Sequence, residues 1–434
     1  MGIWAFNLNI SSHFCVHRVK FVYLTTYLIK AGMKIEKIKI ENYKVYRNTE
    51  IRNLSEFLCF PRGANGAGVN QRSSTYSDFL SDALKAKREK PHLTKEAATG
   101  KYIRVTERGL YIFEIKFRND KIEGETQPLI TYRLEIGFEN GLPIITTEIL
   151  SYRRGGYGRP YRFLDFHRGE GTAIINEDEY SSSSSSTFQD RREQQTLDSP
   201  DILAIKGLGQ FQKFKAISSF RRLLDDWYVS NFQIQEARNV EDVGFSEHLS
   251  TSGNNLAQVT RYIWENHRNV FNTILEKFRK RVPGVENVIA EETQDGRIVL
   301  KFKDNSFQDP FVARFVSDGT IKMFAYLVLL NDPVKHPLLC VEEPENYLHP
   351  ELLPELAEEF REYADKGGQV FISTHSPDFV NALQPDELFW LQKSNGATTI
   401  RKASEDATIK ALYANGDKLG WLWREGYLKG SGPY

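Results

Sequence analysis

Two adjacent glutamates in the last third of the chain are the side chains best suited to chemistry. Residues 338–341 (LLCV) form an apolar run typical of a buried strand, and Glu342 and Glu343 follow it directly. Carboxylates at the end of such a strand lie where α/β sheets bind ligands. One can orient Mg²⁺ through water, and the other can polarise a water that attacks a γ-phosphate. We assign Glu342 to the metal and Glu343 to catalysis; an acidic surface turn before a helix over 350–364 is the alternative.

A histidine follows the next predicted strand. Residues 370–372 (VFI) are apolar, and His375 comes soon after them. The two strands are joined by a helical pattern, so their ends are expected to be neighbours. An imidazole at this place can contact the γ-phosphate and respond to its loss. A lone histidine is more often structural, and that interpretation stays open.

The segment VSDGT precedes an apolar helix that is predicted to extend to Leu330. Ser317 and Gly319 at a helix N-terminus make an anion site through free N–H groups and the helix dipole. The alternative is ordinary capping of the helix by Ser317 or Asp318.

A glycine-rich segment, GANGAGVN at 63–70, has half of a phosphate-binding loop. In the full motif, G-x-x-x-x-G-K-[ST], backbone N–H groups surround the phosphates, the lysine reaches the β/γ-phosphates and the hydroxyl binds Mg²⁺. Val69 and Asn70 stand at the lysine and Ser/Thr positions. The residues that we assign to nucleotide binding here are Gly63, Asn65, Gly66 and Gly68.

Composition limits the class of protein. The 434 residues suffice for two or three domains, and 57 Lys+Arg balance 57 Asp+Glu. No global basic field argues for nucleic acid, although a local patch stays possible. Three widely spaced cysteines fit a reducing compartment. The apolar stretch 21–30 is shorter than a membrane span, so we expect a cytoplasmic protein without membrane contact.

Period-two alternation predicts strands at 35–40, 110–117 and 131–138, and the pattern over 201–281 is helical. The Arg/Gly/Tyr-rich stretch 151–163 is either a solvated hairpin or a segment that binds a phosphate backbone, and six serines at 181–186 indicate a flexible loop.

Met33 is the expected true start of the chain. The predicted division is an upstream extension 1–32, an N-terminal lobe 33–150 with the incomplete loop, a polar loop with a helical lobe 151–310, and a C-terminal lobe 311–434 with the paired glutamates and His375.

VEEPENYLHP at 341–350, STHSP at 373–377 and VSDGT at 316–320 together resemble the RecF/SMC-like branch of ABC-type ATPases, in the compact form without a long coiled coil. The resemblance implies an α/β head with a central, mostly parallel sheet, an N-terminal antiparallel β lobe and a helical lobe. It also implies ATP and Mg²⁺ as cofactors, and a homodimer with ATP sandwiched between two heads. Ser317 and Gly319 would then clamp the γ-phosphate of the partner, and His375 would be the switch histidine.

The resemblance gives weaker support for one further role. Gln210 or Gln212 would be the residue that senses the bound Mg²⁺. The Asp-Glu pair usual in the family is Glu342-Glu343 here, and too few residues follow His375 for a nuclease-type acidic domain.

A shift of reading frame accounts for the incomplete loop. Residues 69–79, back-translated with suitable wobble bases and read one frame over, give K-S-T-L-F-D-V-F-G-F, and 95–102 behave similarly. We therefore expect compensating frameshifts within about 56–108, from sequencing error or pseudogene decay. The chain as written should hydrolyse ATP poorly or not at all. A catalytically dead nucleotide-binding scaffold, and a DNA repair or defence factor gated by ATP, are the competing interpretations.

Overall fold

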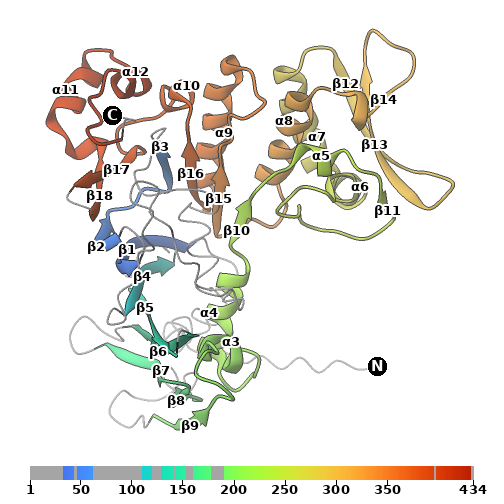
Figure 1. The fold of residues 1–434 in the computed structure, drawn as a ribbon. Helices are drawn as coiled ribbons and strands as arrows, with labels where there is room; N and C mark the ends of the chain where they lie inside the picture. The colour runs from blue at the N-terminus through green and yellow to red at the C-terminus, as the bar shows by residue number, and fades with distance from the viewer. Residues whose placement is uncertain are drawn as a thin grey trace, which may run out of the picture. The chain divides into compact units, whose positions relative to one another are not determined.

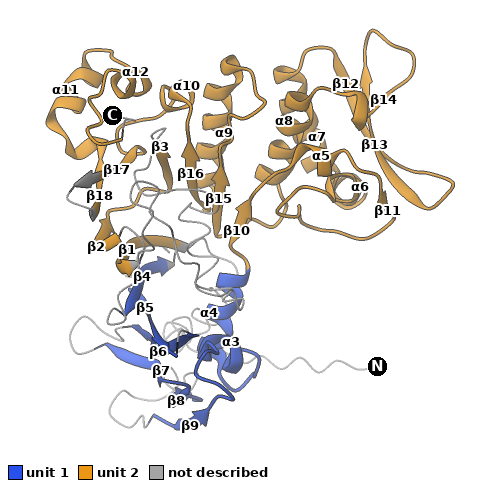
Figure 2. Ribbon diagram, in the orientation of Figure 1, with its two compact units in different colours: residues 1–31, 90–225 blue, residues 32–89, 226–434 orange. Residues whose placement is uncertain are grey.

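The computed structural model of the protein contains two compact units, residues 1–31 with 90–225 and residues 32–89 with 226–434 (Figure 2). The lobe boundaries predicted at 150 and 310 stay predictions. The structure describes residues 33–43, 46–61, 110–119, 129–140, 142–152, 160–176, 190–394 and 397–431.

The first unit contains an antiparallel sheet in which each strand pairs with the next along the chain (Figure 1). Its strands are β4 (Tyr111–Asn119), β5 (Ile130–Glu139), β6 (Leu142–Tyr152), β7 (Tyr161–His167), β8 (Glu170–Ile174) and β9 (Arg192–Thr196). In β5, Ile130, Tyr132 and Leu134 alternate with more exposed residues, so one face of the sheet is apolar. The strands predicted at 110–117 and 131–138 are thereby confirmed, and the stretch 151–163 joins β6 to antiparallel β7.

Two helices cover this apolar face, α3 (Ala204–Leu208) and α4 (Lys215–Asp225). Phe220 of α4 lies 5.2 Å from the Phe117 ring and 5.1 Å from the Tyr132 ring, centroid to centroid. Beside them the fully buried Glu148 accepts hydrogen bonds from the N–H groups that begin α3. A buried carboxylate therefore joins the sheet to the start of a helix.

The second unit contains a parallel sheet in the order β10-β15-β16-β3. Its strands are β3 (Phe57–Pro61), β10 (Tyr228–Ser230), β15 (Leu338–Glu342) and β16 (Gln369–Thr374). β16 is buried at every position, as expected for a parallel strand covered on both faces. The strands predicted at 338–341 and 370–372 are present, and the predicted α/β fold class is confirmed.

Helices flank this sheet. The elements are α8 (Asp318–Leu330), η3 (Pro350–Leu352), α9 (Leu353–Asp365) and α10 (Pro377–Val380). α8 is buried continuously from Ile321 to Leu330, which makes it a core helix. α9 joins β15 to β16 in a strand–helix–strand unit that brings the two strand ends together (Figure 1).

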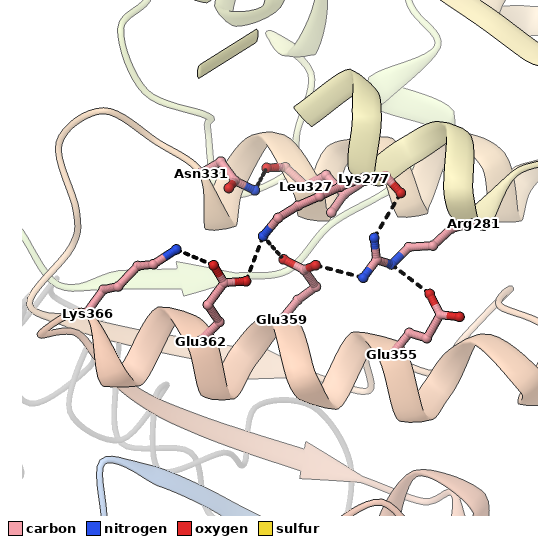
Figure 3. A network of polar contacts seen from close by, with 8 residues as sticks. All are labelled: Lys277, Arg281, Leu327, Asn331, Glu355, Glu359, Glu362 and Lys366. Carbon is pink, nitrogen blue, oxygen red and sulfur yellow. Dashed lines mark hydrogen bonds and ion pairs between the residues drawn. The ribbon is translucent and has the colours of Figure 1, made fainter. Parts of the chain in front are cut away.

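A helical and β-hairpin region precedes α8 in the chain. Its elements are α5 (Ile234–Ala237), β11 (Glu241–Asp242), α6 (Leu256–Asn266), α7 (Arg268–Arg281), β12 (Val285–Glu292), β13 (Arg297–Asp304), β14 (Phe311–Val312) and η2 (Ala313–Phe315). Charged side chains tie α7 to α9: Lys277 Nζ lies 2.7 Å from Glu359 and 2.7 Å from Glu362, and Arg281 lies 2.7 Å from Glu359 (Figure 3).

Two antiparallel hairpins complete the unit. They are β1 (Met33–Tyr43) with β2 (Tyr46–Arg52), and β17 (Phe389–Ser394) with β18 (Ala397–Lys402); η4 (Ala403–Glu405), α11 (Ala407–Ala414) and α12 (Leu419–Arg424) follow. The strand predicted at 35–40 lies within β1. The buried Gln369 amide donates to the carbonyls of Ile35 and Ser55 and accepts from Ile35 N, which fixes β1 against β16.

The helical prediction for 201–281 is wrong in several parts, which include strand β11 (Glu241–Asp242) and the loop 243–255. Residues 228–230 form strand β10, because Tyr228 and Val229 suit a strand and pair with β15. The expected continuous helix ends at Asn266, since His267 has φ −134° and ψ 55°, and α7 starts again at Arg268. No helix in the described ranges is long and apolar enough to cross a bilayer.

Candidate functional site

The parallel sheet brings the two predicted strand ends to one edge, next to the end of β3, which was not predicted. Glu342 stands opposite Ser373 in the β15–β16 register, and Thr374 stands opposite Pro61 of β3. Because parallel strands end at the same edge, Glu343 and His375 emerge beside the point where β3 leads toward Gly63.

Glu343 and His375 are in contact. His375 Nε2 lies 3.3 Å from Glu343 Oε1, and Asn346 Nδ2 donates to Glu343 Oε2 at 2.8 Å. The Glu343 side chain is 30% exposed and that of His375 46%, so a ligand can reach both. The carboxylate is therefore held between an imidazole and an amide at an accessible strand end.

The Glu343 backbone is left-handed, with φ 44°. This conformation costs a non-glycine residue about 1 to 2 kcal/mol. It persists because Glu343 N donates to Ser373 O at 2.7 Å, which extends the strand pairing by one residue. Strain of this kind is concentrated at functional sites.

Glu345 is a third carboxylate at this edge that the sequence interpretation missed. Its Oε1 accepts from the backbone N–H of His375 at 2.7 Å. Its Oε2 and Ser373 Oγ are buried and have no hydrogen-bond partner among the described residues. The spacing E-E-P-E was the available signal, because a proline turn can return the third carboxylate to the strand ends.

Lys322 also belongs to the site and was not predicted. It lies on α8, only 4% of it is exposed, and its Nζ donates to the Glu343 carbonyl at 3.2 Å. The Nζ is 5.6 Å from the Tyr326 ring centroid and 5.7 Å from that of Tyr347. Burial lowers the pKa of Lys322 to about 8, although the nearby Glu345 and Glu343 carboxylates act to raise it. A lysine inside the apolar run of α8 was the signal.

The N-terminus of α8 lies against the loop that follows the glutamates. Ser317 is exposed and is the N-cap, since its Oγ accepts from Thr320 N at 3.2 Å. A Cβ at position 319 would stand 2.8 Å from the Tyr347 carbonyl oxygen, so this close approach requires Gly319. The capping interpretation of Ser317 is confirmed; its role toward an anion stays a prediction.

The remaining predicted residues lie in the first unit or outside the described residues. Gln210 and Gln212 belong to the first unit, where Gln210 Nε2 donates to Lys206 O at 3.3 Å. The glycine-rich loop lies outside the described residues, as do 153–159 and the serine run 181–186. The predicted loop residues concerned are Gly63, Asn65, Gly66 and Gly68, with Val69 and Asn70 after them.

The donor set at the strand ends fits a hard divalent cation. Mg²⁺ prefers oxygen ligands and keeps several waters. Glu342 and Glu343 offer carboxylates at this edge, and Glu345 Oε2 and Ser373 Oγ are oxygens without a hydrogen-bond partner among the described residues. The sequence-based assignment of Mg²⁺ to this edge is therefore compatible with the residues present.

Comparison with known protein families identifies the class of protein. Residues 158–381 match a model of AAA-type ATPase domains. The model is described as "AAA domain, putative AbiEii toxin, Type IV TA system", and since the match spans just over half of the 434 residues, the chain belongs to this family. The matched range contains Ser317, Glu343 and His375, whereas the glycine-rich loop precedes it. The predicted ABC-type ATPase core is thus confirmed at the level of the family.

Individual relatives are distant. The Old nuclease of Escherichia phage P2 is 24% identical over 195 residues, covering 38% of this chain and 32% of that protein, so the match spans about a third of the relative's length. An SMC head bound to the C-winged helix domain of ScpA aligns at 15% identity and a TM-score of 0.46, over 87% of this chain and 99% of the other. The SMC head domain from Thermotoga maritima aligns at 13% identity and a TM-score of 0.40, over 85% and 98%.

Proposed function

We propose that the protein is a RecF-like ATPase of ABC type that binds ATP and Mg²⁺ and acts by sandwiching ATP between two copies of the chain. The observation that carries the proposal is the contact of 3.3 Å between His375 Nε2 and Glu343 Oε1 at adjacent parallel strand ends. In this proposal the parallel sheet is the central sheet of an ATPase head in the cytoplasm.

Each side chain has a stated task in the proposal. Glu343 accepts a proton from the attacking water, and Asn346 and His375 hold its carboxylate in position. Glu342 orients the water shell of Mg²⁺ and Ser317 with Gly319 contacts the nucleotide of the partner copy. Bound Mg²⁺ would neutralise charge that develops on the phosphates.

The loop residues favour a second candidate, a nucleotide-binding scaffold without turnover. Val69 does not supply the positive charge of the P-loop lysine, and Asn70 does not supply the Mg²⁺-binding hydroxyl of the P-loop Ser/Thr. Losing one such electrostatic contact typically costs roughly 10²- to 10³-fold in rate. We therefore propose that turnover by the chain as written is strongly impaired.

The central experiment is ATP turnover by the purified full chain and by a Val69→Lys/Asn70→Ser variant. The proposal expects little turnover by the unaltered chain, a rise of at least about 100-fold in the double variant, and loss of that gain when Glu343→Gln is added. His167→Ala, an exposed histidine of the first unit, is the control that should change nothing. A gain that survives Glu343→Gln would contradict the assignment of Glu343 as the base. No gain in the double variant would contradict the assignment of the whole defect to Val69 and Asn70.

Dimerisation is tested with the same proteins by sedimentation. The Val69→Lys/Asn70→Ser/Glu343→Gln variant should sediment as a dimer with ATP and as a monomer without it, and Ser317→Arg should prevent the dimer. Salt-dependent binding to DNA would favour the gated DNA repair or defence factor, because phosphate contacts weaken steeply with salt.

A long read of the locus across codons 50 to 110 decides whether the loop is broken in the gene. A single frame encoding G-K-S-T would establish a working loop and a faulty translation. The codons as written would instead establish Val69 and Asn70 as genuine and favour the scaffold.

A further inference from the structure

A cluster of two histidines and one aspartate lies at the opposite, amino-terminal edge of the parallel sheet. His248, Asp332 and His336 each offer one ligand atom, and these atoms all lie within 4.8 Å of one another. His336 precedes β15 by two residues, and its neighbour in space, Asp226, precedes β10 by two residues. Asp332 and His336 are four residues apart, but His248 precedes Asp332 by 84 residues, so sequence spacing did not reveal the three together.

The hydrogen bonds of His336 leave a nitrogen free for a metal. Its Nδ1 lies 3.0 Å from the carbonyl oxygen of Asp226, and since a carbonyl only accepts, Nδ1 carries the proton. The other nitrogen, Nε2, is buried and has no partner in the described part of the chain. A proton on Nε2 would be a buried donor without an acceptor among the described residues, so Nε2 carries a lone pair that can bind a metal.

The orientation of His336 is fixed by its surroundings. Its ring stacks on that of Tyr228, with centroids 4.8 Å apart. Tyr363 Oη accepts from His336 N at 2.9 Å and donates to His336 O at 2.9 Å. Metal-binding histidines usually donate the N–H of their second ring nitrogen to a carbonyl or carboxylate, as His336 Nδ1 does to the Asp226 carbonyl, and this bond holds the ring in place.

The other two side chains complete a donor set. Asp332 is buried, its Oδ1 accepts from Val334 N at 2.9 Å, and its Oδ2 lies 2.9 Å from His248 Nδ1. The His248 side chain is 39% exposed and has room to move. Metal bonds of about 2.0 to 2.2 Å in tetrahedral geometry place ligand atoms about 3.3 Å apart, so no gap between the ligand atoms must close by more than roughly 1.5 Å.

We propose that His248, Asp332 and His336 bind a divalent transition metal of the Zn²⁺ class, with water in the fourth position. Two imidazoles and one carboxylate are a donor set that Zn²⁺ favours and that Mg²⁺ does not. The ion links the loop before α6, the end of α8 and the start of β15. The ion is independent of the proposed ATPase activity, since Glu343 and His375 lie at the other edge of the sheet.

The test is zinc content and affinity of the full chain after removal and return of Zn²⁺, measured by elemental analysis and competition with a chromophoric chelator. One Zn²⁺ per chain is expected, with a higher melting temperature when it is bound. His248→Ala and Asp332→Asn should each weaken binding at least about 10- to 100-fold. Visible absorption of the Co²⁺-substituted protein should report tetrahedral coordination in the unaltered chain and change in both variants.

His167→Ala is the matched control, because His167 pairs with Asp165 at 3.2 Å on the exposed surface of the first unit. It should leave zinc binding unchanged. His248 is half-exposed, so its variant should fold, and circular dichroism checks this directly. Absence of stoichiometric zinc in the unaltered chain, or full affinity in a folded His248→Ala protein, would overturn the proposal.

Discussion

At the scale of single residues, Lys322 is the most unusual side chain of the site. Among the described residues, its buried ammonium group has one hydrogen bond, to the Glu343 carbonyl, and two aromatic rings nearby. The charged form is poorly compensated, which is why its pKa falls to about 8 from 10.5. Lys322 thus supports the left-handed turn of Glu343 at a cost in folding free energy.

Replacing Lys322 by methionine should therefore stabilise the protein. With a folded pKa of about 8 and an unfolded pKa of 10.5, the unfolded chain binds more protons between these values, so the stability of the unaltered protein rises with pH across that window. The whole effect is about 3 kcal/mol. Lys322→Met should gain about 1 to 3 kcal/mol at pH 7, and the gain should shrink toward pH 10.5.

Urea unfolding of both proteins at several pH values measures the difference in their free energies of unfolding. The contributions of the other titrating groups are the same in both proteins and cancel in this difference. A variant that is less stable at pH 7 would mean that the bond to the Glu343 carbonyl outweighs the burial of the charge.

The sequence predicted the site residues that are adjacent to recognisable strand ends, and missed those that reach the site from elsewhere. Glu342, Glu343 and His375 follow apolar runs, so strand pairing alone places them. Lys322 arrives from a helix and Glu345 through a turn, and their positions depend on side-chain packing that no local pattern encodes.

At the scale of elements, the α7–α9 contact depends on charges as well as apolar packing. Glu359 is 6% exposed and bonds both Lys277 and Arg281 of α7, whereas Glu355 is 50% exposed and reaches Arg281 only, at 3.0 Å (Figure 3). Removing a buried partner leaves cations without compensation, whereas exposed pairs contribute little.

Glu359→Ala should consequently lower the free energy of unfolding by about 2 to 3 kcal/mol, less than the full cost of a broken buried pair, because Glu362 still contacts Lys277. Glu355→Ala is the matched change on the same helix and should cost at most about 1 kcal/mol. Denaturant titration separates the two. Negligible losses in both variants would show that apolar packing alone holds α7 on α9.

The helices and strands could be predicted where the sequence has a clear apolar pattern. The prediction failed where pairing with a distant strand determines the secondary structure. β5 and β16 were evident from alternation or a continuous apolar run. β10 is only three residues long and sits next to a helix, so its identity depends on β15, a partner more than 100 positions away.

At the scale of the whole molecule, stability should depend on the buried Glu148 of the first unit. Its carboxylate accepts from Ala204 N at 2.5 Å, and from Ile205 N and Tyr132 Oη at 3.0 Å each. Burial raises the pKa of Glu148 to about 7, although these hydrogen bonds act to lower it.

Because the folded pKa lies above the unfolded value of 4.5, the folded chain binds more protons between pH 4.5 and 7, and stability falls as pH rises through that window. The loss attributable to Glu148 is about 3 kcal/mol. Melting temperatures of the unaltered chain and of the Glu148→Gln variant between pH 4.5 and 7 test this prediction. The variant should lose the fall in stability with rising pH that is due to Glu148. Glu139→Gln, an exposed change in the same unit, should retain it.

The order of strands in the parallel sheet has a consequence for synthesis of the chain. β3 and β1 are made first, yet β16, which pairs with β3 and whose Gln369 bonds Ile35, lies 334 residues beyond that isoleucine. At about 5 to 20 residues per second the ribosome needs roughly 15 to 70 s to deliver it. During that interval the apolar FLCFP strand emerges without its partner, so nascent chains should depend on chaperones, and stalled or shortened ones should aggregate.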